Sequence, residues 1–361
     1  MENGLITERR LAFIAYLFDE HKLDALLISR LPHIRYLTGF TGSNAMLLAT
    51  SRNLYFITDS RYEVQARTEV NGWKVVIARR GLLEEIKRRN YLRNAKRIGF
   101  EAKYTTYREY QKAKDLLTGK RWKALEVSIE PIMLQKERYE IDNLKKAIAI
   151  SEGVFNSLLD VIRPGMTERE IAAEITYHHR MNGADGDSFE SIVASGPRAA
   201  LPHGRATTKK IKNNELIIID FGCVVNGYHS DITRTIVVGK PETEALQCFT
   251  VVREALERSI EALRDGVSCK KLDSIARNHI KQKGYGEYFG HSLGHGIGLD
   301  VHELPRISPY SNEQFVEGST VTIEPGIYIP ERFGVRIEDD VLVTADGCER
   351  LTTLTHDFIK V

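Results

Sequence analysis

The sequence contains little cysteine and no long apolar run, and each scarcity excludes a class of protein. Only 4 of the 361 residues are cysteine, and none stand in CxxC spacing, so neither a disulfide framework nor a zinc knuckle is expected. The apolar runs, such as LIIID and AMLLA, fall far short of the roughly 20 residues that a membrane-spanning helix requires. We therefore expect no membrane association.

An excess of charge is also missing. The net charge is +2 and no basic block stands out, which gives no electrostatic footprint for nucleic acid. The first residues, MENGLITERRLAF, carry charges where a secretory signal peptide needs an apolar core. With 42% hydrophobic and 28% charged residues, the composition is typical of a globular protein, which we expect in the cytoplasm.

The length of the chain predicts two domains, because one hydrophobic core rarely organises so many residues. Residues 1–128 alternate helix and strand patterns and predict an α/β domain with a mixed sheet. This part of the sequence contains no phosphate loop, paired acids or histidine cluster. Residues 129–361 predict long helices followed by strand pairs, and the chemistry is expected there.

An internal repeat organises the second predicted domain. LLDVIRPGMTEREIAAEITYHHRMNG aligns with SIEALRDGVSCKKLDSIARNHIKQKG at a constant offset of 101, which places Gly165 on Gly266 and Gly183 on Gly284. A predicted strand pair follows each copy. Chance similarity between amphipathic helices is the alternative, but the shared glycines and strand pairs favour a duplication of helix, helix and hairpin.

The first hairpin is expected to place two aspartates on one face. Asn226-Gly227 is a strong signal for a two-residue turn, and it pairs Val225 with Tyr228. In this register Asp220 and Asp231 are diagonal neighbours on the same sheet face. Asp220 follows the apolar run LIII, so its carboxylate is expected to be buried, which costs several kcal/mol without a partner. A cation between the two acids would compensate both.

The second hairpin is expected to repeat this arrangement with glutamates. With its turn in PERFG centred on Arg332, Glu324 and Glu338 also share one face. Arg336 and Asp340 lie on the Glu338 side of the strand by the period of two, and the opposite side is apolar. We therefore expect a half-buried strand whose charged side is turned toward a site.

A stretch rich in glycine and histidine, GHSLGHGIGLDVHE, lies between the hairpins in the sequence. Four carboxylates with one histidine form a donor set for Mn²⁺, Co²⁺, Zn²⁺ or Fe²⁺, whereas an all-oxygen set would favour Mg²⁺ or Ca²⁺. Two such ions about 3.5–4 Å apart can generate a nucleophilic hydroxide and bind a carbonyl. The alternative is a set of solvated acids on strand faces.

These motifs resemble those of the Xaa-Pro peptidases, the prolidases and Xaa-Pro aminopeptidases of the creatinase/methionine aminopeptidase or "pita-bread" fold. The resemblance covers the whole chain and rests on IIIDFG…GYHSDITRT, GHGIGLDVHE, TIEPGIY and GVRIEDDVLV, in the family's order and spacing. It implies an α/β plus α+β fold, in which a creatinase-like N-terminal domain precedes a pita-bread domain with a pseudo-twofold duplication. It also implies two divalent metal ions (Mn, Co or Zn), peptide substrates with proline in second position, and a homodimer.

The resemblance further implies roles for individual residues. The implied metal ligands, of which the second and last would bridge the ions, are Asp220, Asp231, His295, Glu324 and Glu338. The implied substrate-binding residues are His203, His291, His302 and Arg306, with a structural role as the alternative for His291. The implied catalytic residues are Glu324, His203, His302 and Arg336. The glycines of GHGIG would let the backbone pass close to the metals.

The implied reaction is hydrolysis of the peptide bond before proline by a hydroxide bound to both metals. Glu324 would take the proton and pass it to the leaving nitrogen. The metals and His302 would stabilise the tetrahedral oxygen, and His203 would hold the substrate. Arg306 could grip the free carboxylate of a dipeptide, which favours a dipeptidase over an aminopeptidase without excluding the latter.

Other functions remain open at this point. A methionine aminopeptidase would share the metal site, but the long N-terminal domain fits it poorly. Creatinases have lost the metal acids, and a non-catalytic peptide-binding protein on the same fold is expected to have a broken ligand set. The pair His178-His179 is predicted to lie on a solvated helix face.

Overall fold

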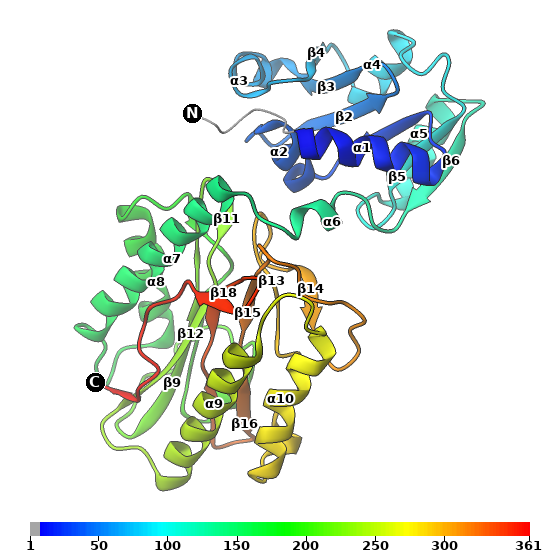
Figure 1. Ribbon diagram of the computed structural model, residues 1–361. Helices are drawn as coiled ribbons and strands as arrows, with labels where there is room; N and C mark the ends of the chain where they lie inside the picture. The colour runs from blue at the N-terminus through cyan, green and yellow to red at the C-terminus, as the bar shows by residue number, and fades with distance from the viewer. Residues whose placement is uncertain (1–7) are drawn as a thin grey trace. The chain divides into compact units, whose positions relative to one another are not determined.

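A computed structural model describes residues 8–361, which divide into two compact units between Met133 and Leu134 (Figure 1). The domain limits inferred from the sequence, at residues 128 and 129, stay a prediction. Every helix of the described residues is too short or too polar to cross a bilayer.

The first unit is built on a six-stranded sheet in the order β4-β3-β2-β1-β5-β6. β1 pairs antiparallel with β2 and parallel with β5, which confirms the predicted mixed sheet. Its strands are β1 (Ala25–Ile28), β2 (Ala45–Thr50), β3 (Leu54–Asp59), β4 (Lys74–Ala78), β5 (Arg97–Glu101) and β6 (Arg121–Leu125). Its helices are α1 (Glu8–His21), α2 (Leu31–Thr38), α3 (Glu63–Glu69), α4 (Leu82–Arg88), α5 (Tyr107–Leu116) and α6 (Glu130–Met133).

The second unit contains two helix pairs, and each pair packs on its own sheet (Figure 1). The helices are α7 (Arg138–Leu159), α8 (Glu168–Met181), α9 (Thr243–Ala262) and α10 (Cys269–Gln282). One sheet has the order β20-β12-β9-β8, formed by β8 (Ile192–Ser195), β9 (Glu215–Phe221), β12 (Ile232–Val238) and β20 (Ile359–Lys360). The other has the order β14-β13-β15-β18-β19, formed by β13 (Gly294–Gly296), β14 (Glu303–Ile307), β15 (Thr320–Ile323), β18 (Asp339–Val343) and β19 (Cys348–Arg350).

Shorter strands extend the two hairpins beyond these sheets. In the first hairpin, β10 lies between β11 and β7; the three strands are β7 (Gly186–Asp187), β10 (Cys223–Val225) and β11 (Tyr228–His229). In the second hairpin, β16 pairs with β17; the two strands are β16 (Gly326–Ile329) and β17 (Phe333–Arg336).

The predicted duplication is confirmed by equivalent backbone contacts in its two copies. Gly165 and Gly266 have φ angles of 91° and 72°, a left-handed region that glycine enters without a steric penalty. The N–H of Gly165 donates to Ile211 O, and the N–H of Gly266 donates to Phe315 O, both at 2.9 Å. The strand order β8-β9-β12 of the first copy corresponds to β13-β15-β18 of the second.

The first hairpin has the predicted register. Val225 pairs with Tyr228 across the two-residue turn, and the same register continues to Asp220, which pairs with Thr233. Since Asp231 lies two residues before Thr233, it shares the face of Asp220 as a diagonal neighbour.

The second turn is centred on Glu331, and the predicted centre at Arg332 is therefore wrong by one residue. Glu331 adopts a left-handed φ of 61°, which closes a three-residue loop. In the resulting register, extended from the pairing of β15 with β18, Glu324 and Glu338 lie opposite one another instead of diagonally. They still share one face. The strand is also not half-buried, because β17 and nearly all of β18 are buried on both faces.

The predicted solvated histidine pair is wrong for His179. Its side chain is fully buried, stacks on Phe221 and places Nδ1 2.7 Å from Asp187 Oδ1. Because Asp187 comes from β7 and Phe221 from β9, the surroundings of this helix position depend on contacts that its own amphipathic pattern does not contain.

Candidate metal centre

Three side chains from separate elements converge in the second unit. Asp231 precedes β12, His295 lies in β13 and Glu338 precedes β18. One ligand atom from each lies within 4.8 Å of the other two. The two acids immediately precede the equivalent strands of the two copies, so the duplication brings them together.

The other two predicted ligands lie against this cluster. His295 Nε2 is 3.6 Å from Glu324 Oε1 and 3.7 Å from Asp231 Oδ2. Asp220 shares the face of Asp231, and its charge raises the pKa values of Asp231 and Glu338. The structure therefore brings together all five side chains that the sequence motifs indicated.

These buried acids lack sufficient positive charge from the protein. Burial, and then the charge of Glu338, raises the pKa values of Asp231 and Glu324 well above the ordinary range. Burial, and then Asp220, raises the pKa of Glu338 to about 8. Oδ1 of Asp220 and Oδ1 of Asp231 are buried and accept no hydrogen bond from any described residue. Buried carboxylates of this kind require cations.

His295 is oriented as a neutral ligand. Its Nδ1 lies 3.1 Å from the carbonyl oxygen of Gly296, which assigns the proton to Nδ1 and leaves the Nε2 lone pair facing the acids. Burial, and then His302, lowers the pKa of His295 to about 3. Oxygen donors with one neutral imidazole suit a first-row divalent cation, so the residues present fit the metal ions that the motifs imply.

Arg336 is fully buried beside the cluster and contacts Asp220 through Nη2. Its Nη1 donates to Tyr328 Oη at 2.8 Å and to the carbonyl of Pro202 at 3.0 Å. Its Nε donates to Thr233 Oγ1 at 3.1 Å. Arg336 therefore joins both hairpins to the segment that carries His203.

Tyr328 is a site residue that the sequence reasoning missed. Its hydroxyl lies 2.9 Å from His291 Nε2, while His291 Nδ1 lies 2.8 Å from the carbonyl of Ser292. Burial raises the pKa of Tyr328 to about 12 and lowers that of His291 to about 3, so the hydroxyl donates to a neutral imidazole. Tyr328 ends the TIEPGIY motif on the face of Glu324 by the period of two, a signal that was present in the sequence.

The remaining predicted residues lie on the accessible side of the cluster. The ring of His302 lies 4.3 Å from that of His295, and both His302 and His203 are exposed. The pKa of His302 is lowered, first because neighbouring atoms shield the ring from water and then because of the charge of His203. Arg306 pairs with His295 across β13 and β14 and keeps an exposed side chain. A substrate approaching the acids would meet these three side chains.

The glycines of GHGIG allow close contacts between strands, and the expected approach of this backbone to the metals stays a prediction. A Cβ at Gly294 would lie 2.0 Å from Thr322 O, and one at Gly296 would lie 2.0 Å from Leu304 O. The absent side chains therefore allow β13 to approach the backbone of its neighbouring strands, which fixes the position of His295 between the two glycines.

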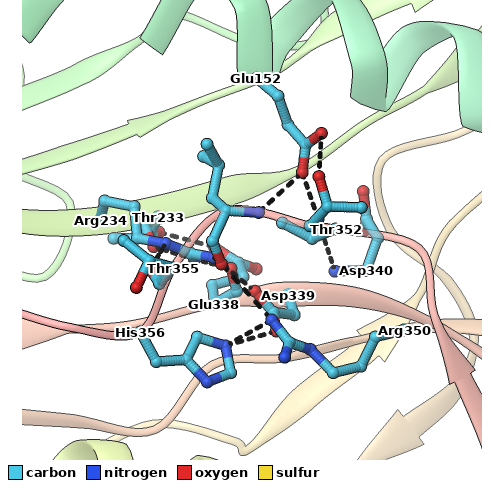
Figure 2. Close-up of polar contacts among 12 residues, drawn as sticks. Glu152, Thr233, Arg234, Glu338, Asp339, Asp340, Arg350, Thr352, Thr355 and His356 are labelled. Carbon is cyan, nitrogen blue, oxygen red and sulfur yellow. Dashed lines mark hydrogen bonds and ion pairs between the residues drawn. The ribbon is translucent and has the colours of Figure 1, made fainter. Parts of the chain in front are cut away.

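Hydrogen bonds from neighbouring residues hold the acids in place (Figure 2). Thr233 forms a backbone bridge with Glu338 and donates from Oγ1 to Glu338 Oε2 at 2.6 Å. The N–H of Asp231 donates to Asp340 Oδ2 at 3.0 Å. Sequence patterns do not reveal these partners, because each contact joins segments about a hundred residues apart.

The chain is similar to known families over both units. Residues 142–345 match metallopeptidase family M24, and residues 10–132 match the creatinase/prolidase N-terminal domain. An Xaa-Pro dipeptidase of Pyrococcus furiosus is 38% identical over 98% of this chain and 100% of that enzyme.

Solved structures resemble the chain along nearly its whole length. An Xaa-Pro dipeptidase from Bacillus anthracis is 38% identical with a TM-score of 0.95, and covers 97% of this chain and 99% of its own. An X-Pro aminopeptidase from Thermotoga maritima is 40% identical with a TM-score of 0.88, and covers 94% and 98%. Both fold units are therefore shared with these structures, and the two proteins are named for different activities, a dipeptidase and an aminopeptidase.

Proposed function

The chain belongs to metallopeptidase family M24 and resembles Xaa-Pro dipeptidases along nearly its whole length, so it is a metal-dependent hydrolase of Xaa-Pro peptides, and we propose that dipeptides are its preferred substrates. We propose that the metal centre holds two divalent ions, with Mn²⁺, Co²⁺ or Zn²⁺ as the expected metals. The observation that carries this proposal is the group of buried acids, with unpartnered oxygens, around a neutral His295. The proposed ligands are Asp220, Asp231, His295, Glu324 and Glu338.

Bound divalent ions supply Lewis-acid chemistry, since they lower the pKa of water and polarise a carbonyl. Glu324 is placed to handle the proton, because Oε1 faces His295 at 3.6 Å and Oε2 faces His291 at 3.9 Å. We therefore assign Glu324 to take a proton from the attacking water and give it to the leaving nitrogen.

Residues around the cluster are assigned to the substrate. His302 and His203 are exposed beside the acids, and we assign them to hold the scissile carbonyl and the peptide. Arg336 holds Asp220 and the Tyr328 hydroxyl in place. The hydrogen bond between Tyr328 and His291 fixes the orientation of the imidazole that faces Glu324.

Arg306 supports the preference for dipeptides. It is exposed on the strand beside His295, where its guanidinium can form two parallel hydrogen bonds to the free carboxylate of a C-terminal proline. A tripeptide would place its carboxylate one residue further away. Loss of such a charged interaction costs roughly 1.5–3 kcal/mol, or about tenfold to a hundredfold in kcat/KM.

The test compares kcat/KM for Xaa-Pro dipeptides and Xaa-Pro-Yaa tripeptides after metal removal and reloading with Mn²⁺, Co²⁺ or Zn²⁺. Wild type is expected to prefer dipeptides. Arg306→Ala is expected to lose the dipeptide preference while retaining tripeptide cleavage, which serves as the matched control. A clear tripeptide preference in wild type would instead establish an aminopeptidase.

The rival functions are discriminated by the same preparation. A methionine aminopeptidase would cleave Met-Ala peptides in preference to Met-Pro peptides. The match of residues 10–132 to the creatinase/prolidase N-terminal domain supports the Xaa-Pro specificity. A folded protein that takes up no divalent metal and hydrolyses neither peptide would be a peptide-binding relative.

We also propose that the enzyme acts in the cytoplasm as a homodimer. The four cysteines are free thiols, and three of them are buried, a state that is compatible with a reducing compartment. Light scattering on the purified protein is expected to give the mass of two chains, and a monomer mass would contradict the dimer.

A further inference from the structure

The C-terminal segment Leu351–His356 is joined to the metal centre by a buried network of charged side chains (Figure 2). Arg234 occupies its middle, with a side chain only 3% exposed. Its Nη1 donates to the carbonyls of Thr233 and Glu338 at 3.0 and 2.7 Å. From the same guanidinium, Nη2 donates to Leu354 O at 2.9 Å and Nε to Thr355 O at 3.1 Å. One buried cation thus joins both acid-bearing segments to the segment Leu351–His356.

Asp339 also binds the guanidinium of Arg234. Its Oδ1 accepts from Arg234 Nη2 at 2.8 Å. Its Oδ2 lies 3.0 Å from Arg350 Nε and 2.7 Å from His356 Nε2. Both carboxylate oxygens are therefore occupied, and Asp339 fixes Arg234 next to the backbone that carries Glu338.

A second set of contacts reaches Asp231. Asp340 accepts from the N–H of Asp231 at 3.0 Å, and its own N–H donates to Thr352 Oγ1 at 2.9 Å. On the other side of the segment, Glu152 of α7 accepts from the N–H of Leu354 at 3.0 Å and from Thr353 Oγ1 at 2.8 Å. The C-terminal segment is held from two directions while it supports Asp231 and Glu338.

Asp231 and Glu338 need such support because they repel one another. The strands that carry them, β12 and β18, belong to different sheets and are linked at this point by a backbone bridge between Thr233 and Glu338. Like charges without a fixed framework would separate. His295 and Glu324 come from β13 and from the residue after β15.

We propose that the segment Leu351–His356, clamped by Arg234 and Asp339, is a positioning element that holds Asp231 and Glu338 at metal-binding separation and thereby sets the metal affinity of the centre. This proposal rests on the proposed metal ligands. Partners that orient metal ligands typically change metal affinity by about 10–100-fold when they are altered.

The first test is Arg234→Lys, which keeps the charge and removes the forked hydrogen bonds. The dissociation constant for Mn²⁺ is measured on metal-free enzyme by competition with a chelating dye, after circular dichroism has verified folding. We expect binding to weaken by about 10–100-fold and kcat to recover largely at saturating Mn²⁺. That recovery separates a positioning role from a general loss of structure.

The second test is Arg350→Ala, which remains informative if Arg234→Lys fails to fold. Arg350 is 38% exposed and contacts Asp339 from the outer side, so its removal loosens the clamp without leaving a buried cation. We expect a smaller weakening of Mn²⁺ binding in the same direction.

A matched control alters another buried ion pair of the same unit. Lys136 Nζ and Glu303 Oε2 are 2.7 Å apart, with side chains 1% and 7% exposed. This pair supports the loop that carries His302, outside the clamp. Glu303→Gln is expected to change KM and leave the Mn²⁺ dissociation constant at the wild-type value.

Folded Arg234→Lys and Arg350→Ala enzymes with wild-type Mn²⁺ affinity would overturn the positioning role. Equal weakening in Glu303→Gln would also overturn it, because the effect would then be general. A wild-type protein that binds no divalent metal would instead defeat the proposed metal centre itself.

Discussion

Glu338 and Asp339 are neighbours in the chain, almost equally buried at 2% and 0% exposure, and they lie in opposite electrostatic environments. Burial, and then Asp220, raises the pKa of Glu338 to about 8. Burial would also raise the pKa of Asp339, but Arg234, His356 and Arg350 outweigh it and the pKa falls. The protein therefore supplies enough positive charge to Asp339, and we propose that metal ions from solution supply the charge that Glu338 still lacks.

The difference separates structural acids from acids that bind a ligand. A buried carboxylate with its own arginine stabilises the fold only as long as both partners remain. A buried carboxylate surrounded by other carboxylates destabilises the fold unless a cation is bound. Burial alone would not distinguish Glu338 from Asp339, whereas the identity of their partners does.

The largest expected effect comes from neutralising Glu338, the acid that we propose to bind metal. Glu338→Gln removes a proposed bridging ligand, and we expect kcat/KM to fall by about 10⁴-fold, because metal-ion stabilisation of the transition state contributes several kcal/mol. Steady-state kinetics with Xaa-Pro dipeptides at saturating Mn²⁺ measure this loss. A decrease of less than tenfold would show that Glu338 lies outside the catalytic centre.

Neutralising Asp339 is expected to affect stability first. Asp339→Asn leaves Arg234 buried without its counter-ion, which costs about 3–5 kcal/mol in the free energy of unfolding. Urea denaturation of metal-free protein measures this change. If Asp339→Asn were as stable as wild type, the compensation attributed to Arg234 would be absent.

In the metal-free protein, Glu338→Gln and Asp339→Asn are expected to change the free energy of unfolding in opposite directions. Glu338→Gln removes repulsion among the acids, so we expect metal-free protein to gain on the order of 1 kcal/mol, a gain of the kind seen when functional residues are replaced. Thermal unfolding in the presence of a chelator measures it. A loss of stability as large as that of Asp339→Asn would remove the contrast between the two acids.

The smallest effect is expected from the partly exposed partner of Asp339. Arg350→Ala removes one of the three side chains that lower the pKa of that carboxylate. Since solvent screens Arg350, we expect at most about 1 kcal/mol of destabilisation. Urea denaturation of Arg350→Ala and Asp339→Asn in parallel compares their losses in the free energy of unfolding. Equal losses would show that Arg350, and not Arg234, is the main counter-ion of Asp339.

Local signals were sufficient to predict most of the proposed ligands. The Asn226-Gly227 turn fixes the first register, and the period of two then places Asp220 and Asp231 on one face. The predicted centre of the second turn was wrong by one residue, because PERFG contains no two-residue turn signal. Glu331 adopts a φ of 61°, and a sequence pattern does not indicate this conformation. Moving the turn centre by one residue moves each pairing partner by two residues. Because side chains alternate between the faces with a period of two, Glu324 and Glu338 still share one face.

Long-range partners could not be predicted. Arg234 and Asp339 are 105 residues apart, and neither occupies a motif that identifies the other. His179 was misplaced for the same reason, since its partners Asp187 and Phe221 come from other elements. Periodicity identifies the face that a residue occupies, but the charge that meets it there depends on the packed fold.

The most direct test is an anomalous difference map from crystals grown with Mn²⁺. We expect two peaks per chain, about 3.5–4 Å apart, between Asp231 and Glu338, with one of them beside His295 Nε2. A single peak would contradict the two-ion centre, and peaks remote from these side chains would contradict the shared metal centre of the two hairpins.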